Sequence, residues 1–145
     1  MFGFDGRHTR AHMYRSILEG IAFTVKNHMD KMNQALNTPL THLIISGGGA
    51  NSNVFMQIFA DIFGVTTSRN QIKGSASVGC VINAGMAVGA FDSYEEAVAK
   101  MVRKDDEFSP NQENTKFYNQ LNDKVYRHVN QHFDPVLKAL SLLVD

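Results

Sequence analysis

The sequence predicts an α/β fold that is rich in helices and holds only a small sheet. The main observation is a strand, a glycine turn and a helix in direct succession over residues 41–64. A second β-prone segment follows over Val65 to Ser68, and the longer segments around it carry the three-and-four spacing of amphipathic helices. Two short strands form a marginal sheet by themselves, which indicates that the chain is part of a larger domain.

The first predicted element is a long helix over residues 8–36. Its apolar residues recur at steps of three and four, which places them on one helix face; they are Tyr14, Ile17, Leu18, Ile21, Val25, Met29 and Met32. Arg15 and Glu19 stand four apart and can pair on the same side. Gly20 lies in mid-helix, where glycine costs about 1 kcal/mol against alanine, so we expect a close neighbour there.

The strand, turn and helix of residues 41–64 come next. His42 to Ile45 is an apolar strand, and the glycines up to Gly49 end it. A helix is predicted from Ser52, and Gly64 suits its left-handed end. Such a turn lets the backbone approach a ligand and directs helix N–H groups at an anion. The three glycines match neither the dinucleotide fingerprint nor the Walker loop, so a plain tight turn stays an equally open interpretation.

After the second strand, residues 69–74 read as a polar loop. Residues 75–90 form a helix of small residues, whose faces favour close packing and also leave room for a ligand. Ser93 and Glu96 have the spacing of a capping box, which predicts a helix to about Val102.

The last part of the chain is predicted to be helical. Residues 103–109 read as a charged loop, and Pro110 suits a first helical position. Apolar residues then recur every four positions, at Phe117, Leu121, Val125, Val129 and Phe133. Pro135 is expected to break or kink this helix.

Composition limits the function classes. The chain has 145 residues, enough for one domain, and 43% are hydrophobic. Fourteen basic and 14 acidic residues cancel, so no basic face indicates nucleic acid or an anionic membrane. No apolar run approaches the roughly 20 residues of a membrane span, and the N-terminus lacks the apolar core of a signal peptide. The single cysteine fits a reducing compartment, so a cytoplasmic protein is expected.

Residues that often carry chemistry have plainer interpretations here. Two histidine pairs have metal-binding spacing, His8 with His12 and His128 with His132, but neither pair is joined by a cysteine or carboxylate cluster. Cys80 lies among small apolar residues and is expected to be a buried, inert thiol. Asp61 is expected on a helix surface or in an ion pair, and the pair Asp105 and Asp106 in solvent. No catalytic residue and no metal ligand is therefore assigned.

Three stretches carry a resemblance to a known family. They are HTRAHMYRSILEGIAF at residues 8–23, SGGGANSNVFMQIFADIFG at 46–64 and SASVGCVINAGMAVGAF at 75–91. In this order and spacing they resemble the C-terminal half of the FGGY carbohydrate kinases. Val78 and Val81 depart from the small residues of that family. The resemblance implies a partial ribonuclease-H-like, actin-type ATPase fold, with residues 1–145 as a single partial domain at the adenosine-binding end.

The resemblance also implies a function. The chain would be the nucleotide-binding part of an ATP-dependent kinase that transfers the γ-phosphate to a sugar or polyol hydroxyl. By position, the adenosine end of ATP falls to Gly47, Gly48, Gly49, Ser52 and Asn53. Mg²⁺ would accompany the ATP, without an identified ligand in this chain.

The sugar site, the catalytic base and the triphosphate loops are expected upstream, so the chain alone is expected to be inactive. An exposed sheet edge and apolar face predict a homo-oligomer. Two alternatives stay open: a non-catalytic nucleotide-binding or regulatory module of the actin-like superfamily, and a structural or oligomerising fragment.

Overall fold

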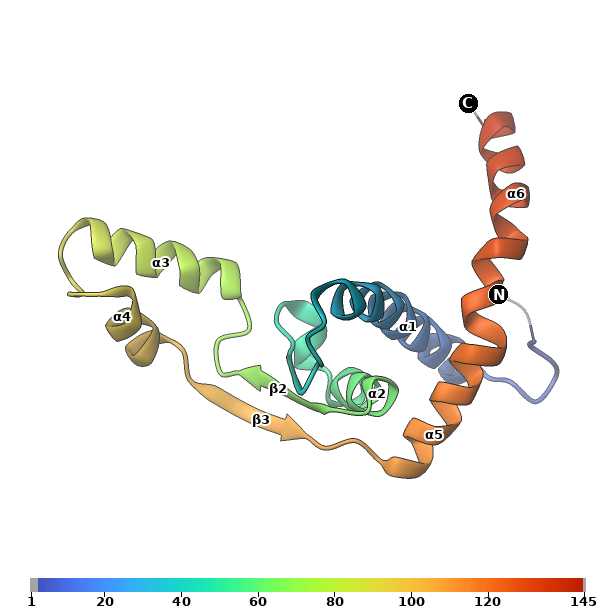
Figure 1. Ribbon diagram of the computed structural model, residues 1–145, viewed down its shortest axis with the longest axis horizontal. Coiled ribbons are helices and arrows are strands. Elements are labelled where there is room, and N and C mark those ends of the chain that lie inside the picture. The colour runs from blue at the N-terminus through green and yellow to red at the C-terminus, as the bar shows by residue number, and fades with distance from the viewer. Residues whose placement is uncertain (1–2, 145) are drawn as a thin grey trace. The chain divides into compact units, whose positions relative to one another are not determined.

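The computed structural model describes residues 3–144 (Figure 1). These residues form two compact units. The helical unit takes residues 3–39, 61–64 and 111–144 of the described chain. The sheet unit takes residues 40–60 and 65–110. The structure thus confirms a helix-rich α/β chain with a small sheet.

The helical unit consists mainly of α1 (Arg10–Leu36), α5 (Gln112–Leu121) and α6 (Arg127–Val144). The π-helical turn η2 (Asn122–Tyr126) joins the last two. The prediction of a long first helix is confirmed to within two residues. Pro135 does not break the helix, because it lies inside α6, and the kink stays a prediction. Pro110 is also not the first helical residue, since Asn111 is the N-cap of α5 and accepts the backbone N–H groups of Glu113 and Asn114.

The core of the helical unit uses a different face of α1 from the predicted one. Of the predicted stripe only Leu18 is buried, while Tyr14, Ile17, Ile21, Val25 and Met32 are exposed. The buried residues beside Leu18 are Ala22 and Phe23. Phe23 stacks on Tyr126 with ring centroids 4.8 Å apart and meets Tyr118 edge-on. Periodicity located the helix but not this face, because the aromatic partners come from the distant C-terminal helices.

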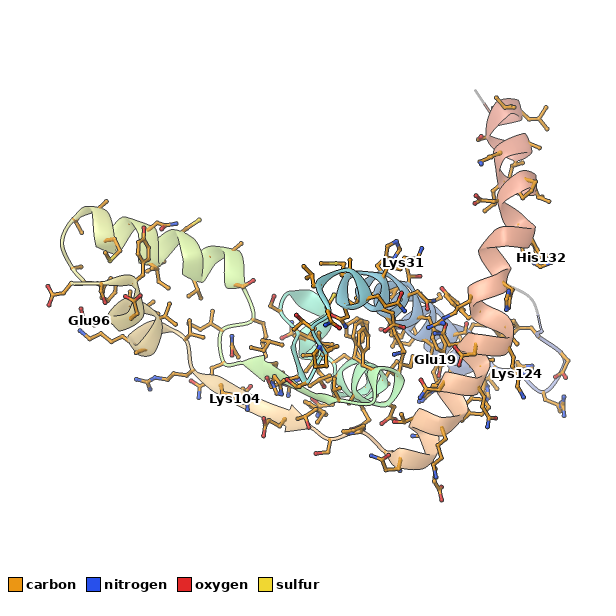
Figure 2. All side chains as sticks on the ribbon, in the orientation of Figure 1. Glu19, Lys31, Glu96, Lys104, Lys124 and His132 are labelled. Carbon is orange, nitrogen blue, oxygen red and sulfur yellow. The ribbon has the colours of Figure 1, made fainter. Side chains whose placement is uncertain are left out.

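Two tyrosines also join α1 to the C-terminal helices by hydrogen bonds. Arg15 and Glu19 pair at 2.7 Å, as predicted. The Tyr118 hydroxyl donates to Glu19 at 2.7 Å and accepts from Arg15 at 2.9 Å, where Figure 2 shows Glu19 on α1. Burial raises the pKa of Tyr118 to about 12. The Tyr126 hydroxyl donates to the carbonyl of Gly20 at 2.9 Å, but a Cβ on Gly20 would lie at an ordinary 3.8 Å from that hydroxyl, so no close neighbour requires glycine there.

The sheet has three strands in the order β1-β2-β3. β1 (His42–Ile44) is parallel to β2 (Thr66–Asn70), and β3 (Lys104–Phe108) is antiparallel to β2. The prediction of a charged loop over residues 103–109 is therefore wrong. So is the placement of Arg69 in a polar loop, because Arg69 lies in β2 and is 7% exposed. Charged residues form strands here because Arg69 and the acidic residues of β3 face one another.

Three α-helices accompany the sheet: α2 (Asn53–Phe63), α3 (Ser75–Ala87) and α4 (Tyr94–Met101). The residues that α2 buries are Phe55, Met56, Ile58, Phe59, Ala60, Asp61, Ile62 and Phe63. Val78 and Ile82 of α3 pack on Ala97 of α4. Ser93 caps α4 by accepting the Glu96 N–H at 3.1 Å, as predicted. The Glu96 carboxylate accepts the backbone N–H of Asp92 at 2.7 Å.

Two predictions about burial are wrong. Cys80 is exposed, because it lies on the outer side of α3 rather than the side that packs on α4. Asp61 is 2% exposed, and its carboxylate accepts hydrogen bonds from Asn111 and Asn114, so it does not lie on a helix surface; the other predicted role, an ion pair, stays a prediction.

Candidate functional site

The candidate site is the glycine turn between β1 and α2, all of it in the sheet unit. Gly47 adopts φ 86° and ψ −170°, a conformation that L side chains rarely take. The 3₁₀ turn η1 (Gly48–Asn51) follows, closed by the Ala50 N–H on the Gly47 carbonyl at 3.1 Å. Ser52 then leads into α2. The predicted succession of strand, glycine turn and helix is confirmed, and Gly64 ends α2 in the left-handed region at φ 68°.

The three glycines of the turn have three different surroundings. Gly47 is required by its positive φ. A Cβ on Gly49 would lie 2.7 Å from the Phe55 ring, so packing requires glycine there. A Cβ on Gly48 would meet nothing within 4 Å, and its φ is ordinary. Neither strain nor packing therefore explains Gly48, and its backbone is open on the exposed side of the turn.

Ser52 and Asn53 begin α2. The Ser52 hydroxyl accepts the Phe55 N–H at 3.3 Å, and the Ser52 carbonyl accepts the Met56 N–H at 3.0 Å. Ser52 thus caps the helix, and its hydroxyl is used within the chain. Asn53 is exposed at the first position of α2. No acidic residue stands in the first turn of α2, so the positive end of its dipole is not offset there.

The turn is fastened to the loop that follows β2. The Gly47 N–H donates to the Lys73 carbonyl at 2.6 Å, and the hydroxyls of Ser46 and Ser75 are 3.0 Å apart. A guanidinium N–H of Arg69 donates to the Ala50 carbonyl at 2.8 Å. Sequence reasoning missed these contacts, because their partners lie 19 to 29 positions away along the chain.

The arrangement suits a ligand with anionic or polar groups rather than acid–base chemistry. It offers exposed backbone at Gly48 and the amino end of a helix. Among residues 3–144, no group of three His, Cys, Asp or Glu side chains could hold a metal ion. The histidine rings are used locally: His12 accepts the Thr9 N–H at 3.1 Å, and His132 bonds to the His128 carbonyl at 2.8 Å.

The small-residue helix α3 leaves a hollow beside it, as one interpretation of its sequence allowed. A cavity of about 170 Å³ lies against α3, lined by Asn70, Ile72, Ser75, Val78, Gly79, Ile82, Met101, Val102 and Arg103. Its lining is mostly apolar. The same helix packs closely on α4 through Val78 and Ile82, so both interpretations of its small residues hold along different parts of its surface.

Comparison with known proteins gives a consistent result. The family model described as the FGGY family of carbohydrate kinases, C-terminal domain, matches residues 1–88. The chain is 44% identical over 138 residues to Uncharacterized sugar kinase YgcE of Escherichia coli (strain K12). That match covers 95% of this chain and 28% of the relative. The chain therefore spans little more than a quarter of the length of this relative.

Solved structures of sugar kinases share the fold. A xylulose kinase from Rhodospirillum rubrum matches with a TM-score of 0.74 and 26% identity, over 93% of this chain and 27% of that one. A Plasmodium falciparum glycerol kinase solved with ADP matches with a TM-score of 0.70 and 26% identity, over 88% of this chain and 26% of that one. In the part of the chain that the structure describes, no helix is long and apolar enough to cross a membrane.

Proposed function

The chain belongs to the FGGY family of carbohydrate kinases, and from that membership we propose that it is the adenosine-binding C-terminal part of an ATP-dependent sugar kinase. The parent reaction is transfer of the ATP γ-phosphate to a sugar or polyol hydroxyl. The observation that carries the proposal is the family match over residues 1–88, which includes the whole glycine turn. We place the protein in the cytoplasm as part of the same proposal.

Within this proposal, some residues of the turn fix its shape and others contact the ligand. Gly47 and Gly49 give the turn its shape, the first through its positive φ and the second by admitting the Phe55 ring. Ser52 starts α2 as its cap. Gly48 and Asn53 are exposed, and in this proposal they contact the ligand directly. The open space at Gly48 is the observation that fits a nucleotide, because a side chain there would occupy the position of a ligand without disturbing the turn.

We propose that this chain alone does not transfer phosphate. Phosphoryl transfer needs a base near the acceptor hydroxyl, donors around the γ-phosphate and a positioned Mg²⁺. The chain spans 28% of its sugar kinase relative, and the described residues contain no cluster of metal-ligating side chains. Mg²⁺, when bound, would neutralise phosphate charge, with the nucleotide phosphates supplying its ligands. The sugar site and the base would belong to the remainder of the kinase.

We also propose that the chain associates with a second copy of itself. The support is the exposed face of α1, where Tyr14, Ile17 and Ile21 are 62%, 50% and 45% exposed. Large exposed apolar surfaces on a folded chain mark sites of association.

The proposal is tested by titration and by assay. ADP, AMP and GDP are titrated into the chain and into its Gly48→Val variant by calorimetry. We expect binding of the adenine nucleotides by the parent chain and a loss of that binding in the variant. ADP release is then assayed with pentuloses, hexuloses, glycerol and gluconate, for this chain and for the full-length product of its gene. Absence of adenine nucleotide binding, or sugar-dependent turnover by the chain alone, would overturn the proposal.

A further inference from the structure

The pairing of β2 with β3 contains an irregularity opposite Arg69. Ser68 is paired with Glu107, and Asn70 with Lys104. Between these pairs, β2 contributes one residue, Arg69, and β3 contributes two, Asp105 and Asp106. Two residues opposite one is the definition of a β-bulge, and bulges re-aim side chains that a regular strand would send to opposite faces. The bulge therefore brings two consecutive carboxylates to a single arginine.

The bulge accounts for the burial of this arginine. Arg69 is 7% exposed, and a buried charge is costly unless it is paired. One guanidinium N–H group donates to the Asp106 carboxylate, and Arg69 Nε lies 3.8 Å from a carboxylate oxygen of Asp105. The guanidinium also lies over the Phe108 ring, 5.4 Å from its centroid. Three residues of β3 therefore contact the arginine, namely Asp105, Asp106 and Phe108, and of these Asp106 accepts a hydrogen bond while Nε keeps only the longer ion-pair distance to Asp105.

The remaining guanidinium nitrogen is directed at the glycine turn. Arg69 Nη1 donates to the carbonyl of Ala50 at 2.8 Å, and Ala50 is fully buried inside η1. A second route runs through Asp105, which accepts from the Lys73 ammonium at 3.2 Å, while the Lys73 carbonyl accepts the Gly47 N–H at 2.6 Å. The acidic pair of β3 is therefore connected to both ends of the turn, at Gly47 and at Ala50.

We propose that Arg69 is a positioning residue for the nucleotide site. The bulge on β3 fixes its guanidinium, the guanidinium fixes the Ala50 carbonyl, and the turn from Gly47 to Asn51 keeps the shape that binds adenine nucleotide. This inference rests on the proposed function, but Arg69 itself need not touch the ligand. A planar guanidinium can bond a carboxylate and a carbonyl at once in a fixed geometry, which a lysine ammonium on a flexible stem does not reproduce.

The test compares three variants of the full chain. Arg69→Lys keeps the positive charge but loses the planar guanidinium that bonds Asp106 and Ala50 at once. Asp106→Asn removes the carboxylate charge that holds the guanidinium, while Arg69 stays in place. Glu107→Gln is the matched control, since Glu107 is on the same strand and its side chain forms an ion pair with the exposed Lys104. ADP affinity is measured by calorimetry, and amide hydrogen exchange is followed at residues 47–52 and, for comparison, in α1.

We expect Arg69→Lys to weaken ADP binding by about tenfold, the worth of one charge-assisted hydrogen bond. Asp106→Asn should weaken it by about threefold, and Glu107→Gln should leave it unchanged. Exchange should accelerate at residues 47–52 in the first two variants and not in α1. ADP binding and exchange that match the parent chain in both variants would overturn the inference.

The two proposals fail in different ways. If the parent chain binds no adenine nucleotide, the proposed function is wrong, and hydrogen exchange at the turn still decides whether Arg69 holds it. If the parent chain binds ADP and Arg69→Lys binds it equally well, the proposed function stands and the role of Arg69 is wrong. Global acceleration of exchange, α1 included, would show an unfolding effect, and the milder Asp106→Asn then decides.

Discussion

The carboxylate of Asp61, near the end of α2, accepts the backbone N–H of Asn111, the N-cap of α5, at 2.8 Å. Its other oxygen accepts from the Asn114 side chain at the same distance. Asp61 is almost fully buried, so these bonds satisfy carboxylate oxygens that water does not reach. The last turn of α2 is thereby joined to the first turn of α5 inside the helical unit.

Substituting Asp61→Asn should lower the free energy of unfolding by about 1 to 3 kcal/mol. The amide oxygen can keep the bond from the Asn111 N–H, but its NH₂ group then faces the Asn114 side chain, whose amide must rotate to accept it. The measurement is urea unfolding followed by circular dichroism. Asp134→Asn is the control, because Asp134 is exposed on α6 and lies 3.8 Å from Lys138. Equal midpoints for the two variants would contradict the role given to Asp61.

Two neighbouring glycines of the turn should respond in opposite ways. Gly49→Ala places a Cβ 2.7 Å from the Phe55 ring and should cost about 1 to 3 kcal/mol of stability. Gly48→Ala meets nothing and should change stability by less than about 0.5 kcal/mol. If the turn binds adenine nucleotide, substitution at Gly48 lowers affinity while the unfolding curve stays in place. A large loss of stability at Gly48 would show that the residue is structural.

Two helical glycines form a second contrasting pair. Gly20 in α1 has room for a methyl group, since a Cβ there would be 3.8 Å from the Tyr126 hydroxyl. Gly20→Ala should therefore raise the free energy of unfolding by about 0.5 to 1 kcal/mol through helix propensity. A Cβ on Gly85 in α3 would overlap the Phe91 ring, so Gly85→Ala should destabilise by about 1 to 3 kcal/mol. Thermal unfolding of the two variants checks both signs.

Because of Tyr118, the free energy of unfolding should fall as the pH rises above about 10. Burial raises its pKa to about 12 in the folded chain, against about 10 when unfolded. Between these values the folded chain keeps a proton that the unfolded chain has released, so this contribution is complete below pH 10 and is lost as pH rises toward 12. Tyr118→Phe should lack this loss, worth up to about 2 kcal/mol, although it is less stable at neutral pH. Urea midpoints of both proteins at pH 9 and 11 measure the difference.

The exposed face of α1 should drive self-association. At tens of micromolar, roughly the range in which weak interfaces register, we expect sedimentation faster than that of a monomer. Replacing Ile17 and Ile21 together by glutamate should shift the chain toward monomer, because both charges would be desolvated in the interface. Val88→Glu, at an 81% exposed position after α3, is the control. A monomer at this concentration, before any substitution, would contradict the proposal.

Local patterns were enough to predict the turn and most helices. The strand, the three glycines and the helical spacing all lie within 24 consecutive residues. Glycine at position 64 predicted the left-handed end of the helix, which the structure shows. The same reasoning missed β3, whose sequence KDDEF has neither alternation nor apolar residues before Phe108. Its partner, Arg69, lies 37 positions from Asp106, and only the folded sheet brings them together.

The candidate site was predicted in part for the same physical reason. Glycine identity signals a special backbone wherever it occurs, so Gly47 could be singled out from sequence alone. The Phe55 ring leaves no room for a Cβ at Gly49, whereas the space beside Gly48 is open. This difference depends on where side chains lie after folding, so the sequence could not show it. The bulge that directs Arg69 depends on register, which no spacing within one strand encodes.

The apolar stripe that α1 leaves in water also governs how stability changes with temperature. Unfolding ordinarily raises the heat capacity by about 12 to 15 cal/mol/K per residue, because apolar surface enters water only then. Leu36 and Tyr14 are already 68% and 62% exposed in the folded chain, and so add little to that increase. For the monomeric chain, the curve of unfolding free energy against temperature should therefore be flatter than the length of the chain implies, and cooling should cost it less of its stability than it costs a protein with the same residues buried. Association through this face would bury these residues and remove the effect.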